Sequence, residues 1–158
     1  MDGTIIRSNI DSWIDKTIEW VKAHVDAQRR QELWTIAREN LQAARHAVQQ
    51  QWYNVSASRS YYAAYTAMWV AVDDPPRTRW QHAGIVKVFA QGYWQSNQMS
   101  LPRDMRKALE TLYKHRLKAD YHGRPVTVDE AQEAMTTAEQ VLILVATELD
   151  LPRNERQL

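Results

Sequence analysis

Apolar residues recur at three- and four-residue steps in one segment of this chain after another, and breaks rich in Pro, Gly or polar residues separate the segments. This spacing is typical of amphipathic helices. The predicted helices cover about residues 9–26, 29–51, 56–72, 81–94, 104–121 and 127–149. The sequence leaves open whether the first two are one long helix or break near Ala27. Asn54 or Ser56 is the expected N-cap of the third helix, and Thr127 that of the last.

Glycine is scarce and cysteine is absent, which narrows both the fold and the chemistry. The chain has four Gly and no Cys in 158 residues. This composition favours helices over strands and excludes Gly-rich phosphate loops, disulfides, zinc–thiolate sites and thiol nucleophiles. We therefore expect an all-α protein, an up-and-down bundle of four to five helices with an extra N-terminal helix. A single domain should span residues 1–158, with residues 1–27 as the N-terminal extension and 28–150 as the bundle core.

The N-terminus lacks the basic and then apolar pattern of a signal peptide. The longest nearly apolar run, Tyr61 to Val72, is too short to cross a bilayer. A soluble, cytoplasmic protein with no membrane contact is expected.

Charge is unevenly distributed along the chain. Residues 103–124 contain seven Lys or Arg against three acidic residues, whereas residues 129–150 contain six acidic residues and no Lys or Arg. One interpretation is that the basic segment binds a polyanion and the acidic segment repels it. The other is two solvated helix faces of opposite charge.

Arg116 interrupts an otherwise apolar helical stripe. The preceding positions of that stripe include Met105, Leu109 and Leu112. An arginine in this place either pairs internally, with Asp120 one turn later as the natural partner, or lines a cleft. Both alternatives stay open at this stage.

The five histidines offer few catalytic candidates. His24 and His46 should face solvent, and His82 should be a hydrogen-bonded residue of the core. His115 and His122 lie seven residues apart and share a helix face. No His-x-x-x-His or Glu-x-x-His spacing occurs, so neither a metal site nor a cofactor is expected.

Three motifs, in this order, resemble those of the HEPN superfamily, especially its small stand-alone bacterial and archaeal proteins. The resemblance covers about residues 30–148 and leaves the N-terminal segment outside. The motifs are Ser58-Arg59-Ser60-Tyr61-Tyr62-Ala63-Ala64-Tyr65, His82-x-Gly84 and Arg116-x-x-Ala119-Asp120-Tyr121.

The resemblance implies a dimeric helical bundle with an Arg-x(4–6)-His motif facing a cleft between protomers. Active members of the family are metal-independent RNases, often toxins held by an antitoxin that is commonly a minimal nucleotidyltransferase. If the family motif is applied to this chain, the resemblance implies that Arg116 and His122 are the catalytic pair and that Asp120 and Tyr121 are supporting residues of the site.

The basic residues Lys114, Lys118 and Arg124 are then the expected contacts to the RNA backbone. Two other functions remain possible for such a chain. One is a non-catalytic HEPN module that binds a nucleotidyltransferase or another protein, and the other is a nucleotide-binding bundle.

Overall fold

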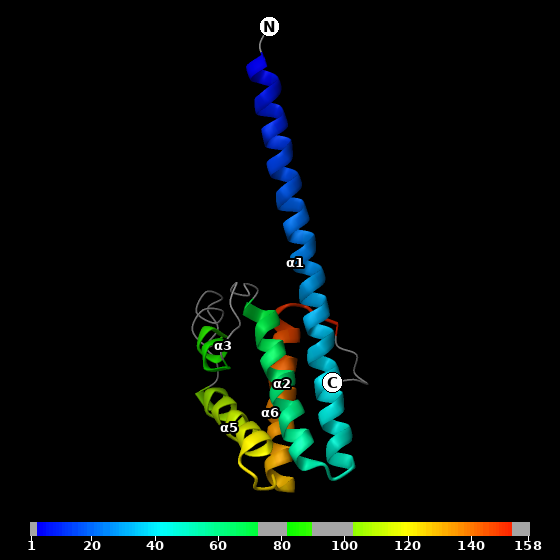
Figure 1. Ribbon diagram of the computed structural model, residues 1–158, viewed down its shortest axis with the longest axis vertical. Coiled ribbons are helices and arrows are strands. Elements are labelled where there is room, and N and C mark those ends of the chain that lie inside the picture. The colour runs from blue at the N-terminus through cyan, green and yellow to red at the C-terminus, as the bar shows by residue number, and fades with distance from the viewer. Residues whose placement is uncertain (1–2, 73–81, 90–102, 153–158) are drawn as a thin grey trace. The chain divides into compact units, whose positions relative to one another are not determined.

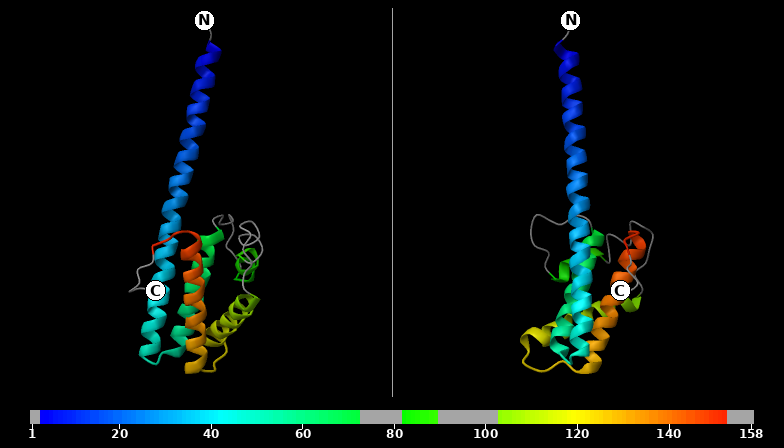
Figure 2. Two further views of the ribbon diagram at one scale, coloured as in Figure 1. Left: turned by 180° about the vertical axis from the view of Figure 1, so that it is seen from behind. Right: turned by 90° about the vertical axis from the view of Figure 1, so that its right-hand side faces the viewer.

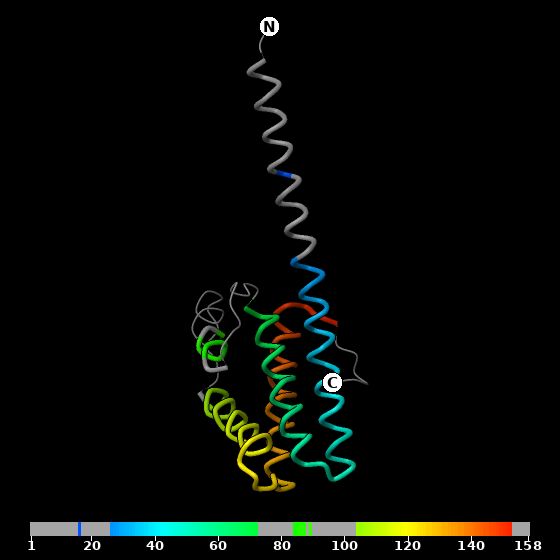
Figure 3. Tube along the Cα trace, viewed as in Figure 1, coloured from blue at the N-terminus to red at the C-terminus, as the bar shows by residue number. Residues whose placement is uncertain are grey.

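In a computed structural model of the chain, every element assigned within the described residues is a helix. The structure describes residues 3–72, 82–89 and 103–152, with side chains for residue 16 and for 26–72, 84–87, 89 and 104–152. Figure 3 colours the residues whose side chains are described. The helices are α1 (Gly3–Gln49), α2 (Tyr53–Val72), α3 (His82–Val88), α5 (Arg103–Tyr121) and α6 (Val128–Glu148), as Figure 1 shows. The all-α prediction is confirmed.

The first two predicted helices are one element, since α1 runs without a break through Ala27. Two compact units can be distinguished, residues 1–32 and residues 33–158. The first unit is the N-terminal part of α1. The second holds the remaining helices. Of the predicted helical segment 81–94, residue 81 and residues 90–94 lie outside the described residues.

In the second unit, α2 is the central helix. It contacts α3, α5 and α6, most extensively α6, and the views in Figures 1 and 2 show α2 and α6 side by side. Alanines at 63, 64, 67 and 71 are all at most 1% exposed. Because these side chains are small, neighbouring helices can approach α2 closely.

The C-terminal part of α1 adds a further layer to this core through Trp34, Ala37 and Leu41, all buried. Arg45 of the same helix forms an ion pair with Glu139 of α6, with 2.7 Å between Nη2 and Oε1. Residues 33–49 are therefore part of the bundle.

The turn from α1 to α2 is closed by backbone hydrogen bonds. Trp52 N–H donates to Ala47 O at 2.8 Å, and Gln51 N–H donates to Val48 O at 3.0 Å, a pattern that places Gln51 in the left-handed region at φ 62°. Because α2 already begins at Tyr53, the prediction that Asn54 or Ser56 caps it is wrong.

Asn54 instead tethers the loop between α5 and α6. Its Oδ1 accepts a hydrogen bond of 2.8 Å from the backbone N–H of Val126. The side chain thus satisfies a backbone donor of a residue that is only 3% exposed.

The signals that end α5 and begin α6 act as predicted. Helix α5 ends at Tyr121, and Gly123 follows at φ 62°, a conformation that glycine adopts without steric cost. Thr127 is the N-cap of α6 and forms a capping box with Glu130.

Candidate functional site around Arg116

Arg116 lies on the buried stripe of α5. Leu109 and Leu112, on the same face, are 3% and 1% exposed, and Arg116 itself is 6% exposed. A guanidinium at this depth needs partners, because removal of a charge from water is costly.

The partners of Arg116 come from two helices. Its Nη2 donates to the hydroxyl of Tyr62 on α2 at 3.1 Å and to that of Tyr121 at 3.2 Å. Its Nε lies 3.0 Å from Oδ2 of Asp120, an ion pair in which the N–H direction misses the oxygen. The expected ion pair between Arg116 and Asp120 is therefore present, and the hydroxyls of Tyr62 and Tyr121 are the other polar partners of the guanidinium.

Aromatic rings surround the same guanidinium. Its central carbon lies 5.6 Å from the ring centroid of Tyr61, 5.7 Å from that of Tyr62 and 5.0 Å from that of Tyr121. Cations within about 6 Å of a ring centroid are attracted to the ring face.

These contacts keep Arg116 charged. Burial acts to lower its pKa, but the hydrogen bond to Tyr62 and the electrostatic effects of Tyr62, Tyr121 and Asp120 prevail, so the pKa lies above its ordinary value. Burial also raises the pKa of Tyr61, and Tyr65 adds to this effect while Arg116 opposes it. The site is therefore a charged guanidinium surrounded by three tyrosine rings and one carboxylate.

An open groove of about 220 Å³ lies beside this cation. Asp120 belongs to both features, since it lines the groove and forms the ion pair with Arg116. The groove is lined by Asn54, Val55, Ser58, Arg59, Ala119 and Asp120. The first and third sequence motifs, far apart in the chain, thus meet at one place.

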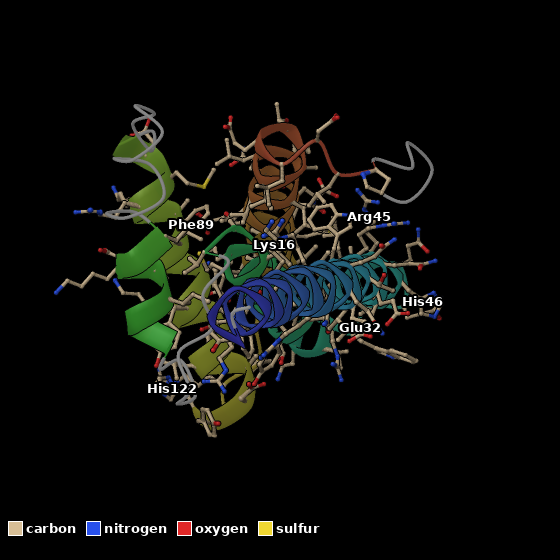
Figure 4. All side chains as sticks on the ribbon, turned by 90° about the horizontal axis from the view of Figure 1, so that it is seen from above. Lys16, Glu32, Arg45, His46, Phe89 and His122 are labelled. Carbon is tan, nitrogen blue, oxygen red and sulfur yellow. The ribbon has the colours of Figure 1, made fainter. Side chains whose placement is uncertain are left out.

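His122 follows α5 directly and is exposed. Its backbone N–H donates to Lys118 O at 3.4 Å, and none of the described contacts of Arg116 involves its ring. Figure 4 shows His122 at the end of α5, on the opposite side of the bundle from His46. The structure thus separates a buried arginine from a solvent-accessible imidazole.

Two side chains of α5, Lys118 and His115, contact carboxylates of α6. Lys118 Nζ lies 2.7 Å from Oε2 of Glu130, and His115 Nε2 lies 2.9 Å from Oε2 of Glu133. The hydrogen bond from Lys118 lowers the pKa of Glu130, and the backbone hydrogen bond from Thr127 adds to this effect. The basic and acidic segments therefore partly neutralise each other across a helix interface.

The remaining predicted contacts to RNA, Lys114 and Arg124, are exposed. His46 is exposed as predicted, whereas the side chains of His24 and His82 lie outside the described residues. Within the described part of the chain, no cluster of three His, Asp or Glu residues could hold a metal ion. None of the described helices is long and apolar enough to cross a membrane.

Sequence reasoning missed the role of Tyr62 and the groove at the start of α2. Tyr62 belongs to the first motif, but its partner Arg116 lies on another helix. The contact depends on how the two helices pack, so the sequence alone does not reveal it. Asn54 and Val55 carry no comparable signal.

None of the curated proteins compared with the chain matches it. The family model described as the HEPN domain matches residues 30–149, which include the whole of the second unit except its last residues. This match covers most of the chain and leaves the N-terminal part of α1 outside, as the motifs predicted. The chain therefore belongs to the HEPN domain family.

Proposed function

We propose that this protein is a homodimeric, metal-independent endoribonuclease, the toxin of a toxin–antitoxin pair in the cytoplasm. The observation that supports this most is the set of groups at the end of α5. A permanently charged Arg116 on α5 lies beside an open groove, and the exposed His122 comes directly after the end of the same helix. The family includes ribonucleases, and the motif spacing is theirs.

The chemistry requires a base, an acid and a cation. Neutral His122 takes the proton of the ribose 2′-hydroxyl, and the 2′-oxygen attacks the adjacent phosphorus. The bond from phosphorus to the 5′-oxygen breaks, and protonated His122 of the partner subunit gives its proton to that leaving oxygen. The products are a 2′,3′-cyclic phosphate and a free 5′-hydroxyl.

Arg116 stabilises the extra negative charge of the five-coordinate phosphorus, for which a planar guanidinium is well suited. A two-fold dimer is needed because one chain supplies only one imidazole of this kind. Lys114 and Arg124, both exposed, attract the RNA backbone, and Lys118 contributes less because Glu130 neutralises it. The antitoxin is a minimal nucleotidyltransferase.

The burial of Arg116 favours a second candidate, a non-catalytic module that binds a nucleotidyltransferase or another protein. Two phenols and a carboxylate already surround its guanidinium, which leaves it 6% exposed. In this case Arg116 holds α2 against α5, and His122 has no chemical role.

The two candidates differ in what His122 does. We expect the purified protein to cleave single-stranded RNA in the presence of EDTA, and His122→Ala to abolish cleavage without loss of fold. The matched control is His46→Ala, which removes another exposed histidine on the other side of the bundle and should cleave like wild type. Cleavage by the His122→Ala protein at the wild-type rate, or no cleavage by any of the three, contradicts the nuclease and leaves the partner module.

A further inference from the structure

The groove beside Arg116 is built from the first two turns of α2 and the last turn of α5. We infer that it is a nucleobase subsite, which receives one unpaired base carrying an exocyclic amino group, next to the phosphate held by Arg116. This inference deepens the proposed function and rests on it for RNA as the ligand. Four features of the groove support it.

The groove offers apolar contact to the faces of a ring. Val55 of α2 is 46% exposed although it is apolar, and Ala119 of α5 also lines the groove. Unpaired bases are bound in proteins by contact with their flat faces and by hydrogen bonds to their edges. Two small apolar side chains from different helices therefore offer contact to the face of a ring.

The polar end of the groove is an acceptor. Asp120 presents a carboxylate whose Oδ2 pairs with Arg116 Nε at 3.0 Å, which orients the group and leaves Oδ1 as a second acceptor. Carboxylates accept hydrogen bonds from amino groups such as N4 of cytosine. Uracil carries an oxygen at the corresponding position. This oxygen is itself an acceptor, so it cannot form a hydrogen bond with the carboxylate.

The same carboxylate argues against a phosphate inside the groove. An anion there would face Asp120 directly, whereas the cation Arg59 lies at an exposed position. Arg59 Nη1 donates to Asn40 Oδ1 at 3.2 Å, and its guanidinium has further donors for a backbone phosphate. The charges thus favour a base in the groove and phosphates outside it.

The size of the groove restricts the ligand. Its volume of about 220 Å³ is below the range of roughly 300–1,000 Å³ that is common for drug-sized ligands. One base fits this description better than a whole dinucleotide. Asn54, anchored by Val126, fixes the wall at the start of α2.

The test is base preference, measured without cleavage. Short fluorescein-labelled oligonucleotides of adenine, cytosine or uracil are made with 2′-O-methyl riboses, which lack the attacking hydroxyl. Fluorescence anisotropy then gives the dissociation constants. We expect the adenine and cytosine oligomers to bind about tenfold more tightly than the uracil oligomer, the effect of roughly one well-formed edge contact. Equal affinity for the three, or no binding of any, overturns the subsite.

Two variants locate the preference. Val55→Trp fills the groove and should remove the preference, whereas Ile143→Trp, at a similarly exposed apolar position on α6 (47%), should keep it. Asp120→Asn replaces a carboxylate, which only accepts hydrogen bonds, with an amide that also donates. The affinity for the uracil oligomer should therefore rise relative to that for the other two. A Val55→Trp protein that melts like wild type and keeps the preference overturns the inference, as does Asp120→Asn with an unchanged ratio.

The subsite and the nuclease fail in different ways. Base-selective binding without cleavage of unmodified RNA leaves the subsite standing and removes the nuclease. Cleavage without any base preference leaves the nuclease and removes the subsite.

Discussion

Tyr62 and Arg116 lie 54 residues apart in the chain, yet the Tyr62 hydroxyl accepts a hydrogen bond of 3.1 Å from the Arg116 guanidinium. This contact joins the central helix α2 to the C-terminal part of α5. The ring of Tyr62 is in edge contact with Tyr61, so the acceptor is held by the aromatic core itself. The position of the arginine therefore depends on the packing of α2.

Tyr62→Phe removes this acceptor and keeps the ring. We expect the free energy of unfolding to fall by about 1–2 kcal/mol, because a charged buried donor loses one of its hydrogen bonds. Urea unfolding followed by circular dichroism measures the change. Tyr53→Phe is the control, since no hydrogen bond of the Tyr53 hydroxyl is found among the described residues, and an equal loss in the two variants contradicts the prediction.

Tyr121 covers Arg116 although it is itself 67% exposed, and it is the last residue of α5. Tyr121→Ala should therefore make Arg116 accessible without disturbing the core. Modification by phenylglyoxal, followed by peptide mass spectrometry, should become several-fold faster at Arg116 in this variant. Trp52→Ala removes another exposed aromatic ring, which contacts His46, and should leave the rate at Arg116 unchanged. Identical rates at Arg116 in wild type and Tyr121→Ala refute a covering role for Tyr121.

Glu130 makes stability depend on pH. Its pKa is lowered in the folded protein, mainly by the hydrogen bond from Lys118, so the unfolded state binds its proton more readily. The stabilisation is fully present above the ordinary glutamate pKa and is lost as pH falls through the lowered folded value.

Glu130→Gln should flatten the loss of thermal stability between neutral and acidic pH. Calorimetric melting temperatures over this range measure the slope. Glu110→Gln, a change at an exposed acid of α5, should retain the wild-type slope. A Glu130→Gln profile that parallels wild type shows that the pair with Lys118 does not contribute.

Gln51 occupies a left-handed position at φ 62° in the turn after α1. Gln51→Gly should stabilise the protein by about 1 kcal/mol, because glycine adopts this conformation without the steric cost of a side chain. Gln42→Gly, at an exposed position inside α1, should destabilise by about the same amount. Melting temperatures that move in the same direction for both variants contradict the assignment of this turn.

The parts of the fold that depend on local sequence could be predicted. The Thr127 cap with Glu130 three residues later, the glycine after α5 and the apolar stripe that reaches Arg116 all follow from helix periodicity and end signals. The family motifs also located the Arg116 region. Each of these rests on residues within a few turns of one another.

The contacts that the sequence did not predict depend on how the helices are rotated against each other. Whether Lys118 faces solvent or Glu130 is set by the packing of α5 on α6, which neither segment encodes alone. The same holds for Tyr62, which sequence reasoning placed in a motif without an arginine as its partner. The uninterrupted α1 follows from the absence of any Pro or Gly between its two predicted segments, yet periodicity alone did not decide it.

The hydrogen bond from Val126 N–H to Asn54 Oδ1 has a mechanical consequence. It acts as a crosslink between the start of α2 and the strap that leads from α5 to α6, so the base of the groove resists widening. A ligand must therefore fit the existing width or break this crosslink and expose a buried amide. Any such opening would also displace Thr127, the next residue and the N-cap of α6. Binding of a ligand in the groove would then alter the start of α6.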